Sequence, residues 1–182
     1  MLRFVADLAK SLLQNSYKPV RRKSADSKSG YENLEARQLL ASITFNAANG
    51  FVTLTGDAAA ETGTATQVGS NYVFTLTGVT SETYPIADVT DIFFRGNDGD
   101  DTLIGGSEND HLRGGSGDDT ISGGKGNDAI LAGDGDDTVV FTGNRDEYIV
   151  KENSNGTINV VDLVSDRDGS DTVYDAETFV FA

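Results

Sequence analysis

A strict nine-residue period is the feature of this sequence that most constrains its fold. Five units follow one another without a break over residues 96–140, and each has Asp at its sixth place and an aliphatic residue at its eighth. The sixth-place acids are Asp101, Asp110, Asp119, Asp128 and Asp137, and the eighth-place aliphatics are Leu103, Leu112, Ile121, Ile130 and Val139. One apolar residue per unit, with glycines at the first, second and fourth places, opposes a helix. The period therefore predicts a loop followed by a short strand in every unit.

Two such units per turn would close a flattened coil. The short strands would form its walls, stacked about 4.8 Å apart, and the eighth-place side chains would fill its inside. A solvated Gly/Asp-rich linker is the alternative interpretation of this composition. A linker has no reason to place an aliphatic residue two positions after every Asp through five units, so the coil is favoured.

Residues 114–122 and 123–131 match every specified place of the pattern Gly-Gly-x-Gly-x-Asp-x-aliphatic-x. The repeats thus resemble the calcium-binding nonapeptides of RTX proteins. The resemblance implies an all-β fold, a right-handed parallel β-roll flanked here by β-rich caps, in which Ca²⁺ lies between successive loops on the same edge. Carried over, it puts Asp101, Asp119 and Asp137 on one edge, and Asp110 and Asp128 on the other.

The same resemblance assigns backbone carbonyls at the second and fourth places to the ion. These residues are Asn97, Gly99, Gly106, Gly115, Gly117, Gly124, Gly126, Gly133 and Gly135. Five units make three loop pairs, and hence about three Ca²⁺ sites. The second unit departs from the pattern because Glu108 replaces its fourth-place glycine, and Asn97 and Ala132 replace glycines in the first and last units.

Facing aspartates make the fold depend on the ion. Two carboxylates about 5 Å apart repel by roughly 3 kcal/mol at an effective dielectric constant near 20, and a divalent cation between them reverses the sign of that interaction. We therefore predict that the repeats are largely disordered without Ca²⁺ and fold when it binds.

The first 41 residues differ in composition from the rest. Residues 1–17 have apolar side chains at helical spacing with charges among them, which fits neither a membrane span nor an ordinary secretory signal. A basic stretch follows, and residues 34–41 then resemble the LEPR-XLL-type motif of many planctomycete surface and secreted proteins, with Ala36 where that family usually has Pro. The resemblance implies that this leader, helical or disordered, directs export. The alternative is a short surface helix with Ser29 and Glu32 as its capping box.

The segments on either side of the repeats have β patterns. Residues 42–95 contain two alternating runs, 51–55 and 72–77, and Phe94 stands nine residues before Leu103, in phase with the repeats. Residues 141–182 contain a hairpin signal at Asn155-Gly156. We expect a cap at each end, because the end rung of a solenoid otherwise exposes apolar side chains and free strand edges.

The C-terminal segment is also similar to the flank of RTX domains in secreted proteases, which often holds a type I secretion signal. In this segment Asp166, Asp168 and Asp171 are candidates for one further ion, and a polar turn between strands is the equal alternative.

Charge and cysteine content indicate an extracellular protein. The net charge is -15, and residues 1–42 contribute +4, so the remainder carries -19. This excess of acids suits a cation-binding surface and excludes nucleic-acid binding. No cysteine is present, so calcium would stabilise the fold in place of disulfides. We expect a secreted or cell-surface location, without a transmembrane segment, because cytosolic calcium is too scarce to fill weak sites.

Catalysis is not expected. His111 is the only histidine and lies at an outward-facing seventh place, no His-Glu-x-x-His motif exists, and cysteine nucleophiles are excluded. Carboxylates beside calcium would be poor proton donors. We predict a secreted calcium-binding β-roll protein, structural or adhesive at the cell surface or in the matrix. The alternative is the calcium-folding and type I secretion module of a toxin- or exoenzyme-like passenger that binds carbohydrate.

Overall fold

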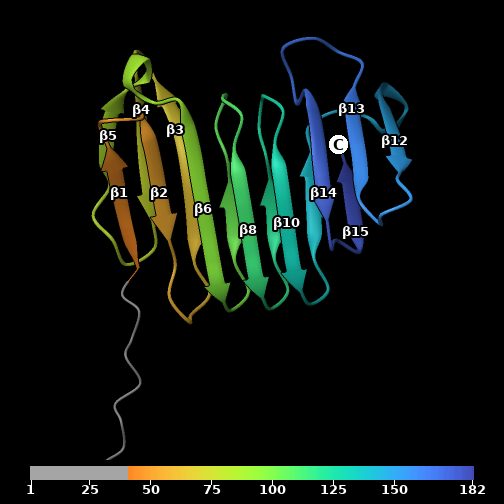
Figure 1. Cartoon of the computed structure of the whole chain (residues 1–182), viewed down its shortest axis with the longest axis horizontal. Coiled ribbons are helices and arrows are strands. Elements are labelled where there is room, and N and C mark those ends of the chain that lie inside the picture. Colours follow the sequence, from red (N-terminus) through yellow and green to blue (C-terminus); the bar gives the residue numbers. More distant parts are fainter. Residues whose placement is uncertain (1–40) are drawn as a thin grey trace, which may run out of the picture. The chain divides into compact units, whose positions relative to one another are not determined.

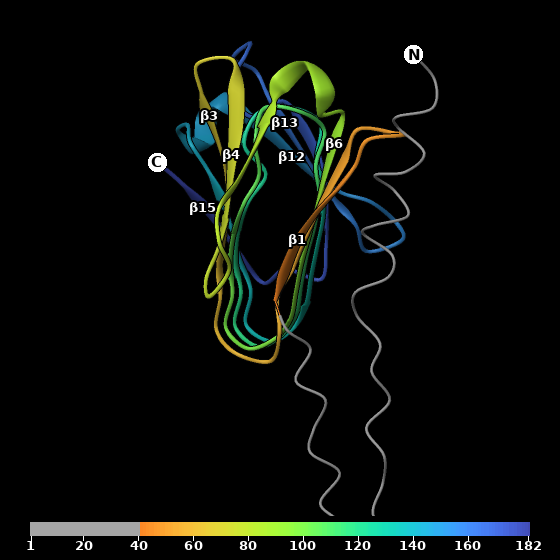
Figure 2. The same cartoon turned by 90° about the vertical axis from the view of Figure 1, so that its left-hand side faces the viewer.

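The computed structural model describes residues 41–182, and these lie in one compact unit. The leader and the LEPR-XLL-like motif lie outside the described residues, apart from Ala41. The described chain is built from two sheets that face each other across a core (Figures 1 and 2). Within this part of the chain no helix is long and apolar enough to cross a membrane.

An eight-stranded sheet forms one wall. Its strands in spatial order are β1 (Ser42–Asn46), β2 (Phe51–Thr55), β6 (Asp91–Asp98), β8 (His111–Ser116), β10 (Ala129–Asp134), β14 (Ser170–Tyr174), β13 (Ile158–Asp162) and β12 (Tyr148–Glu152). A seven-stranded sheet forms the other wall, in the order β15 (Thr178–Phe181), β11 (Thr138–Phe141), β9 (Thr120–Ser122), β7 (Thr102–Ile104), β3 (Thr62–Val68), β4 (Asn71–Leu76) and β5 (Glu82–Pro85). Two short 3₁₀ turns, Ile86–Asp88 and Arg145–Glu147, complete the elements.

The repeats form a β-roll, which confirms the predicted fold class. Strands β6, β8 and β10 stack in parallel in one sheet, and β7, β9 and β11 do so in the other. The register joins residues two units apart, as in Leu103 opposite Ile121 and Leu112 opposite Ile130. Because side chains alternate between the faces of a strand, every eighth-place residue then points to the inside of the roll.

The eighth-place side chains fill the space between the sheets. Leu103, Leu112, Ile121, Ile130 and Val139 are at most 2% exposed. The predicted phase of Phe94 is confirmed, since it pairs with Leu112 and is 1% exposed. The apolar column thus begins before the repeats.

Parallel stacking extends beyond residues 96–140 at both ends. On the N-terminal side β2 pairs with β6 and β3 with β7; on the C-terminal side β14 pairs with β10 and β15 with β11, all in parallel. Each end therefore has one additional rung that lacks the full nonapeptide pattern.

Antiparallel strands cover these outer rungs. At the N-terminal end β4 folds back on β3 and β5 on β4, and the buried rings of Tyr72 and Phe74 close the core. At the C-terminal end β12 and β13 form the hairpin predicted at Asn155-Gly156, in which Gly156 has φ +85°. Tyr148 on β12 packs against Phe141 and Phe181 at ring-centroid distances of 5.5 and 5.1 Å. Apolar side chains of the terminal rungs are thereby covered.

Candidate metal centres

The five sixth-place acids lie on two opposite edges of the roll. Loops 96–101, 114–119 and 132–137 form what we call the odd edge, and loops 105–110 and 123–128 form the even edge (Figure 2). The link between neighbouring loops is the same on both edges: Asp119 Oδ1 accepts the Asp101 N–H at 2.8 Å, and Asp128 Oδ1 accepts the Asp110 N–H at 2.8 Å. Asp137 repeats the contact with the Asp119 N–H. One carboxylate oxygen of Asp119, Asp128 and Asp137 thus joins each of their loops to the loop before it on the same edge.

The other oxygen of each acid has no partner. Asp101 Oδ2, Asp119 Oδ2, Asp128 Oδ2, Asp137 Oδ2 and Asp110 Oδ1 are buried and accept no hydrogen bond, and the five residues are at most 2% exposed. A buried carboxylate oxygen without a partner is costly and rare in folded proteins. Five equivalent cases on two edges indicate that each oxygen faces a ligand that carries positive charge.

Backbone carbonyls gather at the same points. A Cβ atom placed on Gly96 would lie 2.0 Å from Asp101 Oδ2 and 2.7 Å from the Gly114 carbonyl oxygen. At Gly114, the corresponding distances to Asp119 Oδ2 and the Ala132 carbonyl oxygen are 2.1 and 2.5 Å. At Gly96 and Gly114, a carboxylate of the same loop and a carbonyl of the next loop therefore converge in the space that a side chain would need. Carboxylate and carbonyl oxygens are the donors that Ca²⁺ prefers.

The second- and fourth-place residues lie where successive loops approach each other. A Cβ on Gly117 would lie 2.3 Å from the Gly99 carbonyl oxygen, and one on Gly135 would lie 2.1 Å from the Gly117 carbonyl oxygen. Asn97 and the glycines at 99, 115, 117, 124, 126, 133 and 135 all have positive φ. Gly106 takes another conformation and donates its N–H to Asp110 Oδ2 at 2.6 Å, which explains why Oδ1 is the unpaired oxygen of Asp110. All nine assigned carbonyls belong to these loops.

Glu108, the departure in the second unit, keeps its carbonyl in the loop stack. A Cβ on Gly126 would lie 2.0 Å from the Glu108 carbonyl oxygen, as at the regular fourth places. The N-terminal side of this loop is closed by Tyr72, whose hydroxyl accepts the Ser107 N–H at 2.9 Å. Tyr72 thus takes the place of a preceding loop at the N-terminal end of the even edge.

Burial shifts the acids toward their neutral forms. Desolvation raises the pKa of Asp110 to about 8, of Asp128 to about 7 and of Asp119 to about 6, and raises the pKa of Asp101 and Asp137 as well. Backbone N–H donors oppose these shifts. A cation at the unpaired oxygens would take the place of the proton, which is how metal affinity becomes dependent on pH.

Three further acids continue the two stacks. Glu61 donates its N–H to Asp101 Oδ1, Glu177 accepts the Asp137 N–H, and Asp171 accepts the Asp128 N–H, each at 2.8 Å. The nine-residue period does not indicate Glu61 and Glu177, because their neighbours in the stack are 40 residues away instead of two units. The local resemblance of 169–173 to 126–130, with Gly, Asp and an aliphatic residue at the same spacing, is the signal that marks Asp171.

The candidate trio Asp166, Asp168 and Asp171 does not converge. Asp168 instead accepts the Thr142 N–H at 2.8 Å and the hydroxyl hydrogens of Thr142 and Tyr148. Within residues 41–182 no three His, Cys, Asp or Glu side chains form a group that could hold a metal. Any ion in the roll would depend on one or two carboxylates with backbone carbonyls, and the loops supply that set.

Comparison with known families identifies the repeats. The family of the RTX calcium-binding nonapeptide repeat (4 copies) matches residues 95–130, 104–139 and 113–147. Residues 95–147 are therefore RTX calcium-binding nonapeptide repeats. RTX nonapeptide repeats bind Ca²⁺, and the unpaired carboxylate oxygens and close carbonyls of this RTX roll fit that ion. No curated protein matches the chain.

Proposed function

We propose that this RTX protein is secreted, and that its roll folds on binding Ca²⁺ outside the cell and then serves a structural or adhesive role at the cell surface or in the matrix. The observation that carries the proposal is the set of five buried, unpaired carboxylate oxygens stacked on the two edges. Asp101, Asp110, Asp119, Asp128 and Asp137 would hold the ions with carbonyls of the second and fourth places. The acidic balance of the chain and its lack of cysteine support a calcium-rich, extracellular setting.

Calcium-dependent folding is tested by far-UV circular dichroism of the full chain. In excess EGTA we expect a spectrum dominated by disorder, and with about 10 mM Ca²⁺, in the range of weak extracellular modules, a β spectrum. Mg²⁺ at the same concentration is the control, since it demands a smaller octahedral site. Identical spectra in EGTA and in Ca²⁺ would contradict the proposal.

Export is tested on the protein found in the culture medium. Cleavage near Ala41 supports export through the leader, whereas an intact Met1 supports the alternative, a C-terminal type I signal. Retention of the whole chain inside the cell contradicts both routes. Sequencing the N-terminus of the extracellular protein by mass spectrometry distinguishes these outcomes.

We propose a binding role rather than a catalytic one. His111 stacks on Phe93 on the outer face of the eight-stranded sheet, with ring centroids 4.8 Å apart and planes at 4°. Among the described residues, the carboxyls whose pKa is raised are those of the two loop stacks, where an ion and not a substrate explains the shift. Hydrolysis of peptide, ester or glycoside substrates by the calcium-loaded chain would contradict this.

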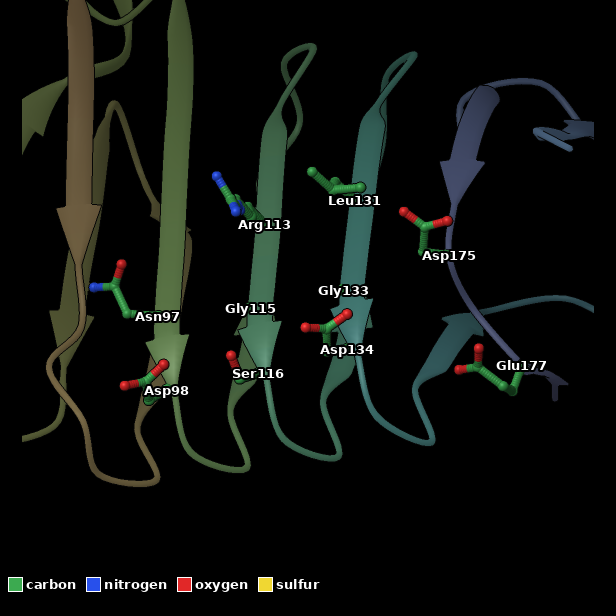
Figure 3. Close-up of a pocket in the computed structure, with 10 residues that line it drawn as sticks. All are labelled: Asn97, Asp98, Arg113, Gly115, Ser116, Leu131, Gly133, Asp134, Asp175 and Glu177. Carbon is green, nitrogen blue, oxygen red and sulfur yellow. The ribbon is translucent and has the colours of Figure 1, made fainter. Parts of the chain in front are cut away.

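One surface feature favours the second candidate function, a carbohydrate-binding passenger. A hollow of about 620 Å³ lies on the outer face of the eight-stranded sheet beside the odd edge (Figure 3). Its lining includes Arg113 on β8, Leu131 on β10 and the acids Asp98, Asp134, Asp175 and Glu177. A second hollow of about 330 Å³ shares Arg113 and Leu131 and is lined by Phe93, His111 and Tyr174.

Aromatic faces beside charged hydrogen-bonding groups suit a flat polar ligand such as a sugar. Retention of the calcium-loaded chain on cellulose, chitin or alginate beads, reduced by Arg113→Ala and by Tyr174→Ala, would support this candidate. Retention of both variants equal to that of the unmodified chain would contradict it. The absence of any retention of the unmodified chain would contradict it too.

A further inference from the structure

Asp128 has an unpaired oxygen at the end of the even edge, beyond the last pair of repeat loops. We propose that residues 166–171, which lie outside the residues that the RTX family matches, close a further Ca²⁺ site on the fourth repeat loop. This inference rests on the proposed calcium-binding function. It assigns the ion to Asp128 and Asp171 together with the Gly126 carbonyl.

Strand register places the two segments on each other. Strand β14 pairs in parallel with β10, with Ala129 opposite Thr172 and Ile130 opposite Val173. Asp171 consequently lies opposite Asp128, although 43 residues separate them instead of the 18 between repeat loops. The intervening chain contains β11 and the β12–β13 hairpin, so the site joins the roll to its C-terminal cap.

The carboxylates repeat the arrangement of the regular loops. Asp171 Oδ1 accepts the Asp128 N–H at 2.8 Å, as Asp128 Oδ1 accepts the Asp110 N–H. Both acids are 2% exposed. Asp128 Oδ2 is buried without a partner. A Cβ on Gly123 would lie 2.0 Å from Asp128 Oδ2, as one on Gly96 would from Asp101 Oδ2, so the two oxygens occupy the same place in their loops. The loop that follows Asp128 in the stack is 166–171.

Backbone approach is as close here as between the repeats. Gly169 has φ +83°, and a Cβ on it would lie 1.7 Å from the Gly126 carbonyl oxygen. Gly169 thus takes the fourth place, in the way Gly117 does against Gly99. The Ser170 N–H is 3.3 Å from the Gly126 oxygen and 3.0 Å from Asn127 Oδ1. The Ser170 N–H occupies one lone pair of the Gly126 carbonyl oxygen, and the second lone pair can coordinate an ion.

Other contacts hold loop 166–171 in place without using the oxygen atoms proposed to bind the ion. Asp168 is bonded to Thr142 and Tyr148. Arg167 forms ion pairs with Asp162 and with Glu147 at 2.5 and 2.7 Å, so its charge is compensated next to the proposed site. The segment is therefore held in place by protein contacts, while Asp128 Oδ2 is left for an ion. Such preorganisation favours binding.

Isothermal titration of the full chain with CaCl₂ tests the site. Asp171→Asn keeps an oxygen that accepts the Asp128 N–H and removes the charge, so we expect one fewer Ca²⁺ per chain with the other sites retained. Asp166→Asn is the matched control, because it removes the same charge from an exposed side chain in the same segment and should leave the stoichiometry unchanged.

The outcomes separate this inference from the proposed function. An unmodified chain that binds no Ca²⁺ overturns both. If the unmodified chain binds Ca²⁺ and Asp171→Asn binds the same number of ions, the further site alone is wrong. If Asp171→Asn loses every ion together with its β spectrum, Asp171 is a structural residue and the assignment is also overturned. Loss of one ion with an unchanged β spectrum in excess Ca²⁺ supports the site.

Discussion

Replacing Asp119 by Asn should change how strongly the stability of the roll depends on calcium. Asp119 lies in the middle of the odd edge, where Oδ1 accepts the Asp101 N–H at 2.8 Å and Oδ2 is buried without a partner. Asn can keep the first contact through its carbonyl oxygen. At the second position it puts an amide N–H₂, which is a donor and does not coordinate Ca²⁺. The substitution therefore removes a single site with little change in packing.

The size of the effect follows from linkage. An ion that binds only the folded state stabilises it by about 2.7 kcal/mol at 100 times its Kd and by about 4.1 kcal/mol at 1,000 times. Because Asp119 has one unpaired oxygen, we expect one lost ion. The difference in unfolding free energy between the two chains should then grow by about 1.4 kcal/mol for each tenfold rise in free Ca²⁺.

A second effect of the same substitution is independent of calcium. Burial raises the pKa of Asp119 to about 6, so the charged form destabilises the metal-free roll at neutral pH. Asn removes this cost. The change shifts the variant's stability by a constant amount and leaves the slope against Ca²⁺ unaffected.

Urea unfolding at a series of buffered Ca²⁺ concentrations, followed by circular dichroism, measures the slope. Asp118→Asn is the matched control. Asp118 is exposed, and its Oδ1 accepts the Asp136 N–H at 3.0 Å. Asn stands at the same fifth place in both even-edge loops, so the substitution suits the loop. We expect no slope difference for this variant. An unfolding free energy of Asp119→Asn that rises with free Ca²⁺ at the same slope as that of the unmodified chain would contradict the prediction. An equal change of slope in both variants would contradict it too.

Three other substitutions test the fold. Gly117→Ala should destabilise the calcium-loaded roll by about 2 kcal/mol or more, because its φ is +127° and the new Cβ would lie 2.3 Å from a carbonyl oxygen. The control is Gly69→Asn, at φ +63° with open space around it, which should be nearly neutral in the same urea titration. The Arg167 guanidinium lowers the pKa of Asp162 to about 2, so the pair stabilises the fold above about pH 4. This contribution, about 1 kcal/mol once solvent screening is included, is lost as the pH falls from 4 to 2. Thermal unfolding of Arg167→Gln at pH 5 and pH 2.5 should therefore show a smaller acid effect than the unmodified chain, and an equal effect would count against the pair. Ile121→Ala, at a fully buried site in the middle of the column, should cost about 2 to 5 kcal/mol in Ca²⁺, and a loss below about 1 kcal/mol would contradict the buried column.

Much of the roll could be predicted because each repeat carries its own conformational instructions. Glycines at fixed places permit the positive-φ backbone of the loops, and an aliphatic residue two positions after Asp must point inward once the strand has formed. Identical local geometry in successive units leaves stacking at a spacing of two units as the arrangement that buries every aliphatic side chain. The in-phase Phe94 follows from the period alone, whereas the assignment of the acids to two edges came from the resemblance to RTX repeats.

The ends of the roll were decided by tertiary structure. Glu61, Asp171 and Glu177 meet the acids of the repeats across 40, 43 and 40 residues, and no local period indicates such distances. Their positions depend on how the antiparallel cap strands return the chain to the roll, because the packing of Tyr72 and Tyr148 sets the register of the outer rungs. The same packing directs Asp168 to Thr142 and Tyr148 and leaves Asp171 facing Asp128. Repetition of a short pattern determines local conformation, whereas contacts between distant segments depend on the burial of side chains that only the folded chain brings together.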